Sequence, residues 1–144
     1  MVDADLVSAK LSELAMRVSR VRSHRKESAA ALDGDADALD LVSFNLMVAV
    51  QICADVASHV IADEGWPAAS SLADSFGRLA SEGVVREETA RALKRAVGLR
   101  NVVAHGYGRV DPMMVHAASH AGIDDLDAFA REVSAWMGAM RPSA

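Results

Sequence analysis

A long run of apolar residues, from about Ala36 to Asp63, most constrains how this chain can fold. A helix drawn through this run is apolar over most of its circumference, so it belongs in the middle of a bundle or between a bundle and a partner. Gly65-Trp66-Pro67 predicts its end, because proline disfavours helical geometry in the residue before it. The apolar positions are Leu41, Phe44, Met47, Val48, Val50, Ile52, Val56, Val60 and Ile61.

Leu46 to Ala62 is the most apolar part of the run, and polar side chains interrupt it at Gln51, Asp55 and His59. We therefore do not interpret it as membrane-spanning. The N-terminal residues lack the apolar core of a signal peptide. Cys53 is the only cysteine, so nothing suggests an oxidising compartment. We expect a soluble cytoplasmic protein with no membrane partner.

Other segments repeat apolar residues every three or four positions, which is typical of amphipathic helices. Ser71 and Asp74 resemble a capping box, and Asp111-Pro112 resembles an N-cap followed by a first-turn proline. Asp124 or Asp125 is expected to cap the last helix. The expected helices cover about 3–27, 36–63, 72–81, 87–105, 112–118 and 125–140.

The whole chain of 144 residues is long enough for one domain, and we expect residues 1–144 to form one. Apolar residues make up 51% and aromatics only 4%, which favours helices packed through small and aliphatic side chains. No credible strand is found. The expected fold is an all-α, up-and-down bundle of five to six helices.

The net charge of −5 argues against a protein that coats nucleic acid non-specifically. The charges are unevenly placed, however, because basic residues concentrate from Lys10 to Lys26 and from Arg86 to Arg100. Each stretch is either a local basic surface or an ordinary solvated helix face.

Arg100-Asn101-Val102-Val103-Ala104-His105-Gly106-Tyr107 is where we expect the chemistry. Gly106 is expected to end the helix, so the motif lies in its last turn and exit loop. Asn101 and His105 are four residues apart, so the amide could orient the imidazole. Arg100 and His105 lie about 140° apart around an ideal helix, which favours a site shared by two copies across a twofold axis.

These residue types suit cleavage of a phosphodiester without a metal. A histidine can take a proton from a ribose 2′-hydroxyl or give one to the leaving oxygen. An arginine can neutralise the charge that grows on the phosphoryl oxygens. His116 and His120 have metal-ligand spacing, but no cysteine or carboxylate nearby completes a set, so no metal or other cofactor is expected.

The sequence resembles the HepT-like toxins of the HEPN superfamily. Their mark is an arginine, a polar residue, three further residues and a histidine, commonly extended to a tyrosine; Arg100, Asn101, His105 and Tyr107 match it. Asn45 to His59 is similar to the family's central helix, Gly83 to Asn101 to its approach to the motif, and Asp111-Pro112 to its exit.

The resemblance implies a homodimeric helical toxin that cleaves RNA without a metal, with Arg100 and His105 catalytic. It further implies a complex with an MntA-like nucleotidyltransferase antitoxin, which attaches AMP to Tyr107 and silences the toxin. The alternative is a non-catalytic helical module that binds and regulates a nucleotidyltransferase or a nucleotide.

Overall fold

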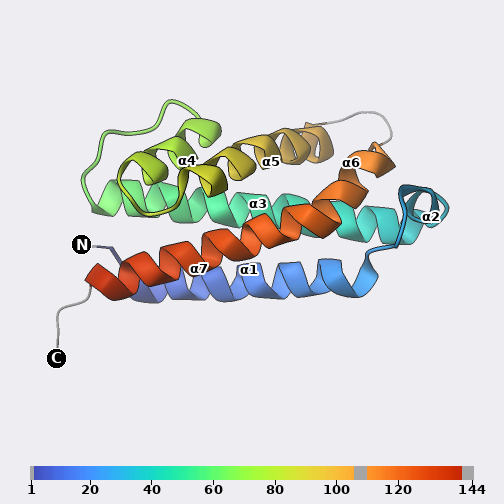
Figure 1. The fold of residues 1–144 in the computed structure, drawn as a ribbon, viewed down its shortest axis with the longest axis horizontal. Helices are drawn as coiled ribbons and strands as arrows, with labels where there is room; N and C mark the ends of the chain where they lie inside the picture. Colours follow the sequence, from blue (N-terminus) through green and yellow to red (C-terminus); the bar gives the residue numbers. More distant parts are fainter. Residues whose placement is uncertain (1, 106–109, 141–144) are drawn as a thin grey trace.

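The computed structural model describes residues 2–105 and 110–140, with the backbone alone at 104 and 105. All its regular elements are helical in that part of the chain (Figure 1). They are α1 (Ala4–His24), α2 (Ala29–Asp33), α3 (Ala36–Asp63), α4 (Leu72–Ser81), α5 (Glu87–His105), α6 (Pro112–Ala117), the π-helix η1 (Ala118–Gly122) and α7 (Ile123–Met140).

Helix α3 is the central element of an up-and-down bundle. It contacts α1, α4, α5 and α7, and successive long helices run in opposite directions (Figure 1). By length and composition alone α3 could cross a membrane, but its apolar side chains form much of the bundle core. The predicted all-α bundle and the predicted bounds of its central helix are confirmed.

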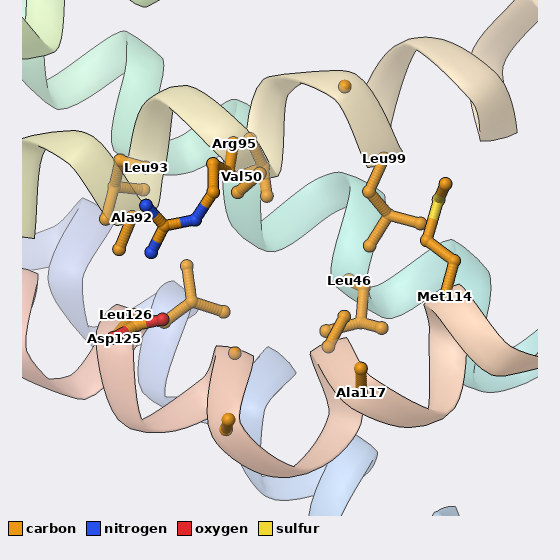
Figure 2. A pocket seen from close by; sticks show the side chains of 15 residues that line it. Leu46, Val50, Ala92, Leu93, Arg95, Leu99, Met114, Ala117, Asp125 and Leu126 are labelled. Atoms are coloured by element: carbon orange, nitrogen blue, oxygen red, sulfur yellow. The ribbon is translucent and has the colours of Figure 1, made fainter.

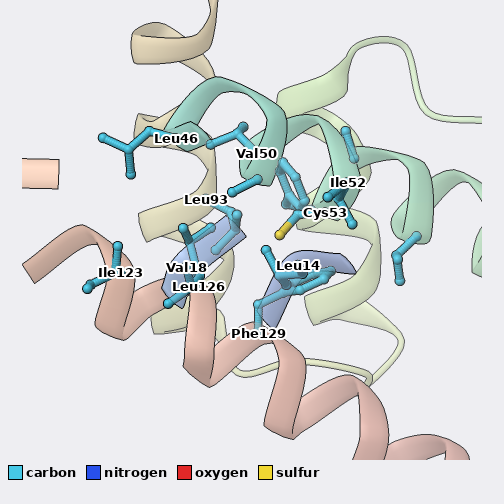
Figure 3. Packing of buried hydrophobic residues seen from close by; sticks show 14 of the residues in the cluster. Leu14, Val18, Leu46, Val50, Ile52, Cys53, Leu93, Ile123, Leu126 and Phe129 are labelled. Atoms are coloured by element: carbon cyan, nitrogen blue, oxygen red, sulfur yellow. The ribbon is translucent and has the colours of Figure 1, made fainter. Parts of the chain in front are cut away.

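The core joins all the long helices through interlocking aliphatic and aromatic side chains (Figure 3). Phe76 of α4 and Phe129 of α7 are fully buried and meet edge to face, with ring centroids 6.0 Å apart. Trp66 and Trp136 form a second pair at 6.1 Å near the end of α3. Edge-to-face contacts favour one relative placement of the helices, because the positive ring edge meets the negative face.

Several predicted helix caps are confirmed. Ser71 Oγ accepts a hydrogen bond of 3.0 Å from the Asp74 N–H, and Asp111 Oδ1 accepts one of 2.9 Å from the Met113 N–H. The carboxylate of Asp74 bonds to Ser70 instead of closing a full capping box on Ser71. The start of α4 is therefore capped, and the carboxylate of Asp74 accepts its hydrogen bonds from Ser70 and not from Ser71.

Two features differ from the prediction. The first helix ends at His24 and a separate short helix, α2, precedes the turn at Gly34. The predicted break before Asp124 and Asp125 is wrong, because η1 joins α6 to α7 without interruption. A continuous helix leaves no unpaired N–H groups at this point, so a capping carboxylate is not needed. Counting α6–η1–α7 as one rod, the described chain has six helices, within the expected number.

Candidate functional site

The predicted motif occupies the C-terminal end of α5. Arg100 and Asn101 lie one turn before the helix ends, and His105 is its last residue. Gly106 and Tyr107 lie outside the described residues, as does the side chain of His105. The structure therefore defines the surroundings of Arg100 and Asn101.

The guanidinium of Arg100 is half-buried and held on two sides. Its Nε–H donates to Oε1 of Gln51 on α3 at 2.9 Å, and an Nη1–H donates to Oδ1 of Asn101 at 2.9 Å. Asn101 thus contacts Arg100. The predicted contact between Asn101 and His105 stays a prediction, because the side chain of His105 lies outside the described residues. Both acceptors are neutral, and no carboxylate among the described residues pairs with Arg100, so none of them offsets its positive charge by direct contact.

The contacts continue from Gln51 across α3 to α1. Nε2 of Gln51 donates to Oδ1 of Asp55 at 3.0 Å, and Oδ2 of Asp55 lies 3.6 Å from Nζ of Lys10. We call Lys10, Asp55, Gln51 and Arg100 the arginine relay. Gln51 and Lys10 were not predicted as site residues from the sequence. Two polar residues four apart on an otherwise apolar helix were the available signal, because they must face a polar partner.

A cavity of about 390 Å³ opens beside this relay. All four relay residues line it, together with Glu13 and apolar residues of α3. The side chains of Lys10 and Asp55 are 28% and 41% exposed, so a polar ligand can reach them. The cavity therefore combines an apolar wall with two cations and two carboxylates.

A second, more apolar groove of about 380 Å³ lies on another face of α5, between α5 and the α6–η1–α7 rod (Figure 2). Arg95 and Asp125 lie together at one end, and Leu99 and Met114 at the other. Burial raises the pKa of Asp125, and nearby Arg95 opposes that rise. Arg100 does not line this groove, so we separate it from the motif.

A family model described as "Ribonuclease HepT-like" matches residues 14–133. The chain belongs to the HepT-like ribonuclease family. The predicted resemblance is confirmed, and the expected enzyme class agrees with it.

The relatives of this HepT-like chain include the mRNA nuclease HepT of Shewanella oneidensis, 25% identical over 126 residues, which are 87% of this chain and 93% of that protein. Among solved structures, the tri-AMPylated Shewanella oneidensis HEPN toxin in complex with MNT antitoxin superposes with a TM-score of 0.84 at 23% identity, covering 92% of this chain and 99% of that one. YutE of Bacillus subtilis, a cytosolic protein of unknown function, gives 0.84 at 14% identity, covering 99% and 96%. These two similarities establish the fold.

Most basic residues of the first basic stretch are bound within the HepT-like chain. Arg17 donates to Asn45 at 3.1 Å, Arg25 donates to the carbonyl of Ser119 at 3.1 Å, and Lys26 pairs with Asp35 at 3.2 Å. These contacts tie α1 and the two residues that follow it to other parts of the bundle. On α5, Arg91, Lys94 and Arg95 are exposed, and Arg95 lies near the carboxylate of Asp125.

His116 and His120 contact backbone instead of a shared ligand site. Their rings lie 4.5 Å apart, and each Nε2 is within hydrogen-bond distance of a backbone carbonyl, that of Glu27 at 3.1 Å and that of Lys26 at 2.9 Å. They join α6 and η1 to the connection after α1. Among the described residues, no group of three or more histidine, cysteine or acidic side chains could hold a metal ion.

Proposed function

We propose that this HepT-like chain is the toxin of a toxin–antitoxin pair and cleaves RNA without a metal, with Arg100 and His105 catalytic. The observation that carries the proposal is the placement of Arg100. Its guanidinium is fixed at the C-terminal end of α5 by neutral acceptors, five residues before His105, in a chain of this ribonuclease family. A fixed, uncompensated cation suits a phosphodiester transition state.

In the proposed reaction the ribose 2′-oxygen attacks the phosphorus while the bond to the 5′-oxygen breaks. His105 takes the proton from the 2′-hydroxyl or supplies one to the leaving 5′-oxygen, and water accepts or supplies the other proton. Arg100 donates hydrogen bonds to the phosphoryl oxygens as their negative charge increases. The products are a 2′,3′-cyclic phosphate and a 5′-hydroxyl. Exposed Arg91, Lys94 and Arg95 lie about 120–180° around α5 from Arg100, so we do not assign them to this phosphate.

We further propose that two copies share the site. In a continuous helix from Arg100 to His105, the two positions lie about 140° apart, while the Arg100 side chain is turned toward α3. One copy does not easily bring both groups to one phosphate, whereas a twofold-related partner could supply the second. Half-exposed Phe44 and Met16 on neighbouring helices are apolar surface available for such a contact.

Tyr107 is proposed as the acceptor of AMP from a nucleotidyltransferase antitoxin. The tri-AMPylated toxin in complex with its MNT antitoxin supports this assignment for a chain of the same fold. AMP on the phenol would add bulk and negative charge two residues from His105, where an RNA phosphate must bind. Modification would therefore silence cleavage.

The test is cleavage of several RNAs by the purified protein in the presence of EDTA. Wild type should cut, while Arg100→Ala and His105→Ala should lose cleavage yet keep wild-type circular dichroism. Arg131→Ala removes an exposed arginine of α7 far along the chain from the motif and serves as the control.

A non-catalytic regulatory module is the second candidate, because the net charge of −5 is unfavourable for binding RNA. Equal inertness of wild type and both variants, with no toxicity in cells, would leave this candidate standing.

A further inference from the structure

We propose that Gln51 and Asp55 are positioning residues that set the guanidinium of Arg100 for attack on RNA while leaving its charge unpaired. The inference rests on the proposed function of Arg100. It comes from the arginine relay, which passes from α5 through α3 to α1.

The hydrogen bonds of the relay can be assigned in only one direction from donor to acceptor. Nε–H of arginine can only donate, so the group of Gln51 that faces it must be the carbonyl oxygen. The amide nitrogen of Gln51 then has to face an acceptor, and the carboxylate of Asp55 is one. Lys10 in turn contacts the second oxygen of Asp55. Each group therefore fixes the orientation of the next.

The platform under the relay is rigid. Gln51 and Asp55 project from α3, between residues such as Ile52 and Ala54 that are at least 96% buried. The Nε–H of Arg100 is held by Gln51 and one Nη1–H by Asn101, so the second N–H of Nη1 and both N–H groups of Nη2 remain for contact with phosphate. A fixed guanidinium does not have to be ordered again as the transition state forms.

The position of the negative charge of Asp55 matters for catalysis. A carboxylate in direct contact with Arg100 would hold it equally well but would compete with the phosphate for its charge. Here the neutral amide of Gln51 contacts Arg100. The carboxylate of Asp55 contacts Gln51 and Lys10 instead. Gln51 thus supplies orientation without neutralisation.

Four variants separate orientation from charge. Gln51→Leu removes the acceptor, and kcat should fall about tenfold to a hundredfold. Gln51→Glu keeps an acceptor for Nε–H but places a carboxylate against Arg100, and kcat/KM should fall at least about tenfold. Asp55→Asn still offers an oxygen to Gln51 and should retain activity to within about threefold, whereas Asp55→Leu should not.

The hydrogen bonding of the Arg100 Nε–H group can be followed independently of activity through its signal in nitrogen-15 NMR spectra. The signal is assigned because it is absent from the spectrum of Arg100→Lys. The signal should shift and exchange faster with water in Gln51→Leu, and persist in Gln51→Glu and Asp55→Asn. Asn45→Ala, also on α3, is the matched control, because it removes the recorded contact with Arg17 and should lower stability without changing kcat or the Arg100 signal.

An unchanged Arg100 signal in Gln51→Leu would overturn the relay, and a changed signal with unchanged kcat would overturn its positioning role. Full activity of Gln51→Glu would overturn the argument from charge. Failure of the proposed function has a different signature: wild type and all variants are then equally inert, whatever the NMR signal does.

Discussion

Glu132 of α7 accepts a hydrogen bond of 2.7 Å from the hydroxyl of Thr89, which is buried in the first turn of α5. The same carboxylate accepts one of 2.7 Å from the backbone N–H of Arg86, just before the helix begins. Helix α5 is therefore fixed at its N-terminal end by α7 and at its motif end by Gln51 of α3. The motif sits on a helix that cannot easily slide or rotate.

Glu132→Ala should lower the free energy of unfolding by about 1–3 kcal/mol, because it leaves the buried hydroxyl of Thr89 without its acceptor. Urea denaturation followed by circular dichroism measures the loss. Glu132→Gln keeps an acceptor oxygen and should lose clearly less. Equal stability of both variants and wild type would show that this contact does not hold α5.

Arg100→Lys should reduce kcat roughly 10²–10³-fold although it keeps the positive charge. A lysine has no Nε–H for Gln51 and no planar fork for phosphate. Steady-state cleavage of a short RNA measures the effect. Arg91→Lys, an exposed arginine on the same helix, should change kcat little, and wild-type activity of Arg100→Lys would mean that charge alone suffices.

Tyr107→Phe should remain an active ribonuclease after incubation with the antitoxin and ATP, whereas wild type should lose activity. The phenylalanine ring keeps the size of the side chain but has no hydroxyl to form the bond to AMP. Intact-protein mass spectrometry should find added AMP on wild type and none on the variant. AMP on the variant would place the acceptor elsewhere.

The thiol of Cys53 should make the folded protein less stable at alkaline pH. Cys53 is fully buried in the core, and burial raises the pKa of its thiol far above the ordinary range (Figure 3). Above about pH 8.5 the unfolded chain releases this proton and the folded protein keeps it. The free energy of unfolding should then fall by up to about 1.4 kcal/mol per pH unit.

The difference in unfolding free energy between wild type and Cys53→Ala, measured from pH 7 to 10, isolates this contribution from other titrating groups. The same burial predicts that iodoacetamide modifies Cys53 only in the unfolded chain. Rapid alkylation of the folded protein, or parallel pH profiles for the two proteins, would contradict the prediction.

Local patterns in the sequence determined the helices. The apolar run predicted α3 within its observed bounds, because side chains on all faces of a helix can be buried only at the centre of a bundle. Asp111 and Pro112 located the start of α6 through the chemistry of their own turn. The motif residues could also be recognised from the sequence, because their order and spacing in the chain match a family pattern.

The contacts between helices were decided by tertiary structure. No local rule predicts that Gln51 would meet Arg100, 49 residues away, because that contact depends on how α3 and α5 rotate as they pack. The join through η1 was missed for a related reason: packing and the Arg25 contact with Ser119 favour a continuous rod over the break that two acidic residues suggested. The sequence alone thus located the catalytic candidates, and only the fold showed what holds Arg100 in place.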